Sequence, residues 1–191
     1  MSNTQTPPSE RTRVKRGNKR ADYDRETVCA IIDAQPLCHV GVVRDGYPMV
    51  TPTICWREGG RLYWHGSSKS AMVLAALDGE VCVTVSLMDG WVMARSAFHH
   101  SANYRSAMIY GRPEKSADED KPAHLKAMIE TYFPGRWDTL RPINAAELKG
   151  TTVLSLALDE ASAKIRTGGP VDDDEDYAMP IWAGVLPTFE A

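Results

Sequence analysis

The stretch Leu62-Tyr63-Trp64-His65-Gly66-Ser67-Ser68-Lys69-Ser70 determines how the rest of the chain is interpreted. Its first three residues suit the pleated, half-buried surface of a β-strand. Gly66 permits a sharp turn or a close approach of the backbone to a ligand. Serine hydroxyls can cap a helix, and the residues from Ala71 to Leu77 favour helix formation. The stretch therefore predicts a strand, a short polar loop and a helix over residues 68–77.

This loop has two interpretations. A helix N-terminus presents free N–H groups and the positive end of its dipole to an anion. Lys69 adds a positive charge, and Ser67, Ser68 and Ser70 could donate hydrogen bonds to phosphate oxygens. Alternatively, the loop is an ordinary strand-to-helix connection that a serine caps. The two roles can coexist, so the loop alone does not choose between them.

The segments before the loop predict an antiparallel meander. Residues 37–43 and 49–56 are apolar enough for strands, and Asp45-Gly46 between them is a strong hairpin signal. Pro52 predicts a sheet edge or a bulge within the second strand, because proline cannot donate to a ladder. Before these strands, Asp24 is a candidate cap for a short helix that ends before Pro36.

The segments after the loop continue the alternation. Residues 81–87 alternate apolar and small polar side chains, which is typical of a strand, and Asp89-Gly90 predicts a hairpin turn into a strand over 91–97. Residues 98–106 are polar, aromatic and basic, and we expect them to connect to a strand over 107–111. Two further strands are predicted over 151–158 and 161–166.

One surface helix is predicted over residues 118–133. Its apolar side chains recur at the helical period and form one stripe, namely Leu125, Met128, Ile129, Tyr132 and Phe133. Pro134-Gly135 ends this helix. Farther on, Asn144 and Glu147 have the spacing of a capping box.

Many short strands with glycine-rich turns indicate a mainly β protein built on a closed antiparallel barrel. The helices over 68–77 and 118–133 would cover its openings. No GxGxxG or phosphate-loop pattern follows a strand, so the sequence supports neither a Rossmann fold nor a nucleoside triphosphatase. We expect a flexible basic arm over residues 1–20 and a single domain over 21–191. The arm is either solvated or folded over a site that holds an anion.

Composition restricts the partners. The net charge of −3 argues against general binding to nucleic acid or to anionic membranes, and no apolar run is long enough to span a bilayer. The four cysteines have no zinc spacing, so we expect buried free thiols and a cytoplasmic protein. His99 and His100 are adjacent, and neighbours on a strand point to opposite faces, so no metal site is expected.

Three motifs together resemble those of the FMN-binding split-barrel families. They are the stretch Leu62 to Ser70, the stretch Asn103-Tyr104-Arg105-Ser106 four residues before Gly111, and the tail from Pro180 to Pro187 with Trp182. These families include pyridoxamine 5′-phosphate oxidase-like proteins and nitroimidazole-resistance-type flavoproteins. The resemblance extends from about residue 13 to the C-terminus, and it implies an antiparallel split β-barrel with a few peripheral helices.

The resemblance also implies a cofactor and its contacts. FMN would bind between two subunits of a homodimer, with its phosphate near Lys69 and Arg105. The implied cofactor contacts are Thr53, His65, Gly66, Ser67, Ser68, Lys69, Ser70, Asn103, Tyr104, Arg105, Ser106 and Trp182. His65 is the candidate catalytic residue, because an imidazole beside a flavin can position a substrate or transfer a proton. Each of these residues also has a structural alternative, such as a loop-fixing His65, a strand residue Thr53 or a core Trp182.

The implied function is that of an FMN-dependent oxidoreductase. It would use a reduced nicotinamide to reduce a small substrate such as a nitro-aromatic compound. The alternative is a flavin- or haem-binding module with little turnover. Pyridoxamine phosphate oxidase activity itself is not expected, because the tail after Trp182 lacks the arginine and histidine of those enzymes, and the phosphate loop offers only Lys69.

Overall fold

The computed structural model describes residues 6–188, which form ten strands and four α-helices. The strands are β1 (Ala21–Asp22), β2 (Leu37–Arg44), β3 (Tyr47–Glu58), β4 (Arg61–Ser67), β5 (Val81–Met93), β6 (Ser101–Gly111), β7 (Glu114–Lys115), β8 (Thr151–Ala157), β9 (Ala161–Arg166) and β10 (Gly184–Pro187). The helices are α1 (Arg25–Asp33), α2 (Ala71–Asp78), α3 (Lys121–Tyr132) and α4 (Ala145–Gly150).

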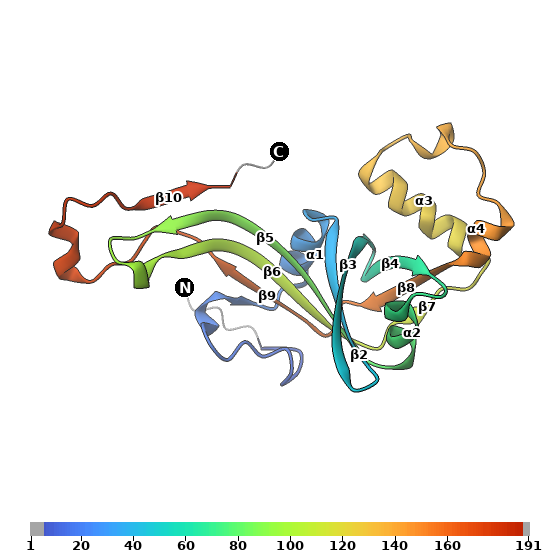
Figure 1. The fold of residues 1–191 in the computed structure, drawn as a ribbon, viewed down its shortest axis with the longest axis horizontal. Helices are drawn as coiled ribbons and strands as arrows, with labels where there is room; N and C mark the ends of the chain where they lie inside the picture. The colour runs from blue at the N-terminus through green and yellow to red at the C-terminus, as the bar shows by residue number, and fades with distance from the viewer. Residues whose placement is uncertain (1–5, 189–191) are drawn as a thin grey trace.

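All of the strand pairs are antiparallel, which confirms the mainly β prediction. The order is β1-β9-β6-β5-β2-β3-β4-β8-β7, and β10 adds to β5. Within residues 6–188 the two end strands of this path do not pair with each other, so the barrel is split rather than closed. Figure 1 shows the long strands β5 and β6 extending away from the barrel, with β10 beside β5. We call this extension, formed by the distal parts of β5, β6 and β9 together with β10, the wing.

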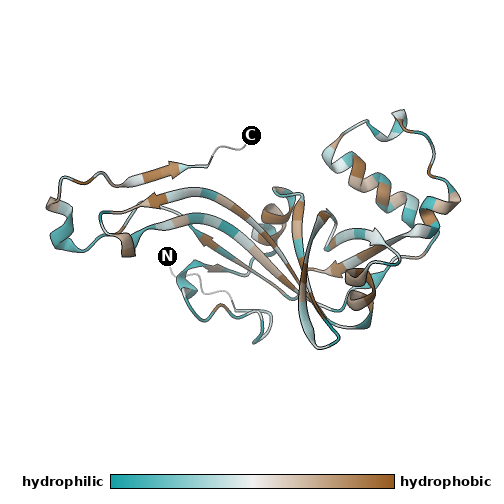
Figure 2. Cartoon of the chain, viewed as in Figure 1, coloured by the Kyte–Doolittle hydropathy of each residue, from teal (hydrophilic) through white to brown (hydrophobic). Residues whose placement is uncertain are grey.

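The main core lies between the barrel strands, α1 and α2. Val28 and Ile32 of α1 and Val73 of α2 pack with strand residues such as Val83 and Trp64. Figure 2 shows hydrophobic residues concentrated along the strands where they cross at the centre of the molecule. Asp24 caps α1 as predicted, because its carboxylate accepts a hydrogen bond from the N–H of Thr27 at 3.1 Å.

A second, smaller core lies under α3. Trp56 and Tyr63 stack with ring centroids 5.8 Å apart, and Leu125, Met128 and Tyr132 of α3 cover them. Three of the five residues of the predicted stripe therefore pack as expected. Ile129 is not among the residues that pack on this core, and Phe133 lies after the end of the helix at Tyr132 and is 60% exposed.

The hairpin between β2 and β3 is confirmed. Asp45 and Gly46 have positive φ angles of 51° and 79°, which is the conformation that a two-residue type I′ turn requires. Pro52 pairs with His39 of β2, and β4 pairs with β3 only from Cys55 onward. Pro52 therefore lies on a stretch of strand edge, as predicted.

The predicted hairpin turn at Asp89-Gly90 is wrong. Strand β5 continues through this dipeptide to Met93, and the pairing with β6 shifts register between Met88 and Gly90. Gly90 is needed for another reason, because a Cβ atom there would lie 2.8 Å from the carbonyl oxygen of Leu186 in β10. The turn comes after Ala94, and β6 begins at Ser101, so most of the expected connection over 98–106 is strand.

None of the helices over residues 6–188 combines the length and the apolar composition needed to cross a bilayer. Within the same residues, no three His, Cys, Asp or Glu side chains gather into a group that could hold a metal ion. The four cysteines are free thiols; Cys38 and Cys55 are buried, and Cys29 and Cys82 are half-buried.

Candidate functional site

The turn between β4 and α2 is held by backbone hydrogen bonds. The N–H of Ser68 donates to the carbonyl of Gly150 at 2.9 Å, and the N–H of Ser70 donates to the carbonyl of Ser67 at 2.9 Å. Ser70 is the N-cap residue of α2, but its hydroxyl makes no capping hydrogen bond. Within residues 6–188, the first amides of α2 therefore receive no capping hydrogen bond from the Ser70 side chain, and Ser67 and Lys69 are exposed beside them. This arrangement can accept an anion.

Gly66 serves close packing between β4 and α2. A Cβ atom at this position would lie 2.8 Å from Cγ2 of Val73, a separation that real Cβ atoms essentially never show. Its φ angle is not in the left-handed region. The sequence suggested that Gly66 permits either a sharp turn or a close approach to a ligand. The structure supports a close approach, but the backbone approaches helix α2 rather than a ligand.

A cavity of about 490 Å³ adjoins the turn, and Ser68 lines it. Lys115 of β7, Lys121 of α3 and Lys149 of α4 line the same cavity, together with one carboxylate, Asp118. Lys121 is already engaged, because its ammonium group contacts Asp118 Oδ1 at 2.8 Å and the carbonyl of Leu148 at 3.1 Å. Sequence reasoning missed these lysines, since only the fold brings three separate elements to the turn.

His65 lies beside the second core. Its ring centroid is 6.2 Å from that of Trp56, and its Nδ1 atom is buried with no hydrogen-bond partner among the described residues. Burial lowers the pKa of His65 below its ordinary value of 6.5, so the ring is neutral at physiological pH. The side chain is half-buried and points away from the main core that Leu62 and Trp64 enter.

We expect His65 to make the protein less stable in mild acid. A histidine whose pKa is lowered by folding binds its proton more readily in the unfolded chain, so stability falls as the pH drops through 6.5 toward the folded pKa. The free energy of unfolding, measured by urea titration at pH 7.5 and pH 5.5, should fall less in His65→Gln than in the unchanged protein. An equal fall in both proteins would show that His65 makes no such contribution.

The predicted cofactor contacts on β6 lie on the wing and not at the β4–α2 turn. Asn103 accepts a hydrogen bond from Arg166 and donates one to the carbonyl of Gly168 at 3.1 Å. Arg105 is held by Asp89, with its Nη2 atom 2.7 Å from Oδ1 and its Nε atom 3.1 Å from both carboxylate oxygens. Arg105 therefore stabilises the irregular part of β5, and a phosphate would have to compete with Asp89 for it.

The remaining predicted residues fall into separate places. Tyr104 and Ser106 face Arg166 and Lys164 across the β6–β9 pair, and Thr53 pairs with Cys38 between β3 and β2. Trp182 lies just before β10 and is 63% exposed, so it is not a core residue of this chain. Figure 1 shows the β4–α2 turn and the wing at opposite ends of the molecule. One chain therefore brings His65 to Ser70 together but not the complete predicted set.

Comparisons with known proteins agree with this architecture. A model of the family described as pyridoxamine 5′-phosphate oxidase matches residues 24–165. Among solved structures, a flavocytochrome from Azotobacter vinelandii is 50% identical, with a TM-score of 0.94 over 98% of this chain and 88% of that chain. The FAD and heme binding protein from Mycobacterium smegmatis is 39% identical, with a TM-score of 0.85 over 90% of this chain and 87% of that chain.

A more distant structure shares the fold. It is a protein from Bacteroides thetaiotaomicron assigned to 5-nitroimidazole antibiotic resistance, which is 22% identical with a TM-score of 0.63 over 76% of this chain and 86% of that chain. A search of curated protein sequences finds no match.

Proposed function

The chain belongs to the pyridoxamine 5′-phosphate oxidase family, as the match over residues 24–165 shows, and from this premise we propose that it is a flavin-nucleotide-binding redox protein. The observation that carries the proposal is the β4–α2 turn. Its helix N-terminus lacks a side-chain cap, and exposed Ser67 and Lys69 lie beside it. A flavin bound there would supply hydride and electron transfer, and the protein would supply binding and orientation.

FAD is the flavin that we propose, in place of the FMN that the sequence suggested. FAD carries two phosphates and FMN carries one. Besides Lys69, the turn has Lys115 and Lys149 around the adjoining cavity, which provides charge for a second phosphate. The 39% identical relative is described as an FAD and heme binding protein, which supports the same choice.

For the reaction, we propose transfer of electrons from a reduced nicotinamide to a small acceptor such as a nitro-aromatic compound. The half-buried His65 at the end of β4 is the candidate residue for positioning that acceptor. Its pKa, which burial lowers, makes a neutral imidazole that can donate or accept a hydrogen bond but is a weak proton source at pH 7.

Haem binding is the second candidate function. Two relatives are described as a flavocytochrome and as an FAD and heme binding protein. In this chain, the neutral His65 ring has a nitrogen atom without a hydrogen-bond partner among residues 6–188, in an aromatic setting beside Trp56. A neutral imidazole of this kind would be able to hold haem iron, so His65 is the residue that we propose for it.

A homodimer would complete the site. Large apolar side chains are exposed along the wing and the tail, including Trp91, Phe98, Trp182 and Leu186, and Phe98 is 90% exposed. A second exposed apolar group lies along β2 and β3, with Val43, Tyr47, Val50 and Ile54. Exposed apolar surface of this extent is typical of an interface between subunits.

We propose that the tail of one subunit docks near the turn of its partner. Light scattering at micromolar concentration should then give twice the chain mass of 21.1 kDa.

The phosphate contact is tested by a titration with riboflavin, FMN and FAD. We expect FAD to bind most tightly and riboflavin most weakly, because only the nucleotides carry phosphate. Lys69→Ala should weaken FAD by about tenfold, the scale of one charge-assisted hydrogen bond, and leave riboflavin unchanged. The matched control is Lys126→Ala, at an exposed position of α3 that lines neither the turn nor its cavity. Equal affinity for riboflavin and FAD would refute the phosphate assignment.

A further inference from the structure

We propose that the N-terminal arm and β9 form a second anion site, which binds the phosphate groups of a small ligand. The site consists of Arg16, Lys19 and Arg20 of the arm with Lys164 and Arg166 of β9, and we call these five residues the arm cluster. It is separate from the β4–α2 turn, and it goes beyond the proposed flavin function.

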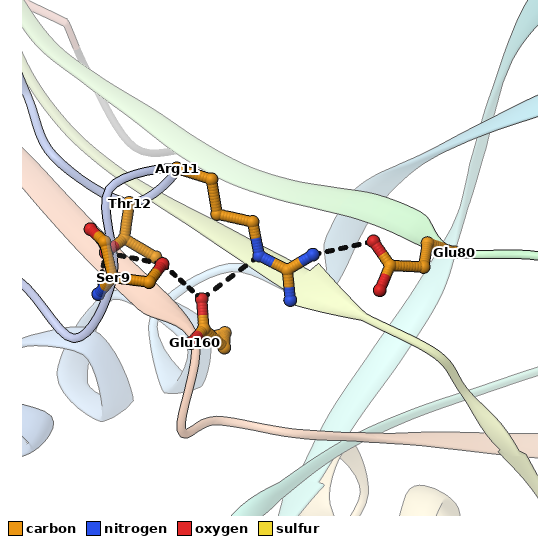
Figure 3. Close-up of polar contacts among 5 residues, drawn as sticks. All are labelled: Ser9, Arg11, Thr12, Glu80 and Glu160. Carbon is orange, nitrogen blue, oxygen red and sulfur yellow. Dashed lines mark hydrogen bonds and ion pairs between the residues drawn. The ribbon is translucent and has the colours of Figure 1, made fainter.

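Part of the arm contacts the barrel, although most of residues 6–20 are exposed. Ser9 donates to Glu160 at 2.5 Å, and Arg11 bridges Glu160 at 3.0 Å and Glu80 at 2.6 Å, as Figure 3 shows. Thr12 is buried, and the N–H of Val14 donates to the hydroxyl of Tyr23 at 2.9 Å. The sequence predicted a flexible arm; the part of it that the structure describes makes these contacts, and residues 1–5 lie outside the described residues.

The basic residues of the arm divide into a paired group and an unpaired group. Arg11 pairs with Glu80 and Glu160, while Arg13 and Lys15 both pair with Glu10. Within residues 6–188, the arm cluster forms no ion pair, although four of its members line one cavity, namely Arg16, Lys19, Arg20 and Lys164. The pairing residues precede Arg16, so the excess of positive charge begins where the arm meets β9.

The fold brings the two halves of the cluster together. The ammonium group of Lys164 donates to the carbonyl of Arg16 at 3.1 Å, and Gly17 takes a positive φ of 68° that turns the chain next to it. Lys164 and Arg166 are two residues apart on β9, so their side chains leave the same face of the strand. A cavity of about 440 Å³ lies among Arg16, Lys19, Arg20 and Lys164. Its volume is in the range of small-molecule sites.

Arg166 is the buried member of the arm cluster and is not part of the cavity lining. Only 8% of it is exposed, and among residues 6–188 its guanidinium donates to the neutral side-chain oxygen of Asn103. Burial lowers the pKa of Arg166, and the neighbouring charge of Arg20 lowers it further, yet a guanidinium remains protonated. Asp22, which lies close to the arm in sequence, uses its carboxylate to accept hydrogen bonds from the N–H of Asp24 and the hydroxyl of Thr27.

Converging cations without a counter-charge favour a ligand of high negative charge. Like charges around one cavity repel each other, and an anion that several cations contact at once relieves the repulsion. Phosphate suits the site because it carries up to two charges and several acceptor oxygens, and guanidinium groups bind it through paired hydrogen bonds. The overall net charge of −3 excludes a uniformly basic surface as the cause of the cluster.

The test uses the full-length protein with its bound cofactor and compares two double variants. Lys19→Gln with Arg20→Gln removes two exposed charges from the arm cluster. Arg13→Gln with Lys15→Gln removes two charges from the same arm, but from residues that pair with Glu10. Both variants change the net charge equally, so they separate a specific site from a general charge effect. Calorimetric titration with inorganic pyrophosphate at low salt measures binding, and the visible spectrum records cofactor content.

We expect the unchanged protein to bind one pyrophosphate per chain saturably. The Lys19 and Arg20 variant should bind it at least about tenfold more weakly, the scale of one lost charge-assisted hydrogen bond, and the control should change less than about twofold. Cofactor content should be the same in all three proteins. A colourless protein would contradict the proposed flavin function, but pyrophosphate binding at the arm cluster could still be measured. Tighter binding of ADP than of pyrophosphate would assign the phosphates to a nucleotide, and the reverse would assign a free anion.

Two results would overturn the proposal. The first is no saturable binding of pyrophosphate or ADP by the unchanged protein. The second is an equal loss in both double variants, accompanied by tighter binding of an RNA oligonucleotide than of either small ligand, which would indicate a diffuse nucleic-acid surface.

Discussion

Trp64→Ala is expected to lower the free energy of unfolding by about 3–5 kcal/mol, the loss typical of removing a large aromatic side chain from a core. Trp64 is fully buried in the main core, and its strand β4 is hydrogen-bonded to β3 on one side and β8 on the other. Removing the indole leaves a cavity that neighbours on two paired strands cannot fill. Denaturant unfolding of the cofactor-free protein measures the loss.

Trp64→Phe separates packing from hydrogen bonding. Among the described residues, the Nε1 atom of Trp64 is buried without a hydrogen-bond partner. Replacing the indole by a phenyl ring removes this unsatisfied donor and leaves a smaller cavity, so the cost should be below about 2 kcal/mol. A cost as large as that of Trp64→Ala would mean that the indole nitrogen makes an essential contact and that packing alone does not explain the tryptophan.

Gly66→Ala is expected to destabilise the protein by about 1–3 kcal/mol and to weaken flavin binding with it. The added methyl group would overlap Cγ2 of Val73, so α2 must move away from β4. That movement displaces the helix N-terminus on which the proposed phosphate contact depends. Thermal unfolding and FAD titration measure the two effects.

The matched control is a second substitution that removes the overlapping atom. In Gly66→Ala with Val73→Ala, the clash disappears, and part of both the stability and the FAD affinity should return, because the effects of substitutions at residues in contact are not additive. If the double variant loses the sum of the two single costs, then close packing of Gly66 on Val73 is not the reason for the glycine.

Local signals predicted most of the fold. Alternation and Asp45-Gly46 located the β2–β3 hairpin, and the capping box at Asn144 and Glu147 is present with both of its hydrogen bonds. The hairpin turn predicted at Asp89-Gly90 was wrong because the same dipeptide also suits a bulge. The tight contact that excludes a side chain from Gly90 comes from β10, nearly a hundred residues later. No pattern near residue 90 reports that contact.

The candidate site was less predictable for the same reason. The turn from His65 to Ser70 is contiguous, so its residues stay together whatever the rest of the chain does. Arg105 was expected to meet phosphate, but its partner Asp89 comes from the neighbouring strand. The lysines around the cavity at Ser68 come from β7, α3 and α4, and no spacing in the sequence relates them. The arm cluster likewise depends on where Arg16 docks on Lys164.

The most direct test of the central claim is the visible absorption spectrum of the protein as purified, with chromatography of the released cofactor. If the β4–α2 turn holds a flavin nucleotide, the protein should be yellow, with flavin absorption bands and FAD released on denaturation; an additional Soret band would support the second candidate function, haem. A colourless protein that takes up neither FAD nor FMN on titration would contradict the proposal that this chain is a flavin-nucleotide-binding redox protein.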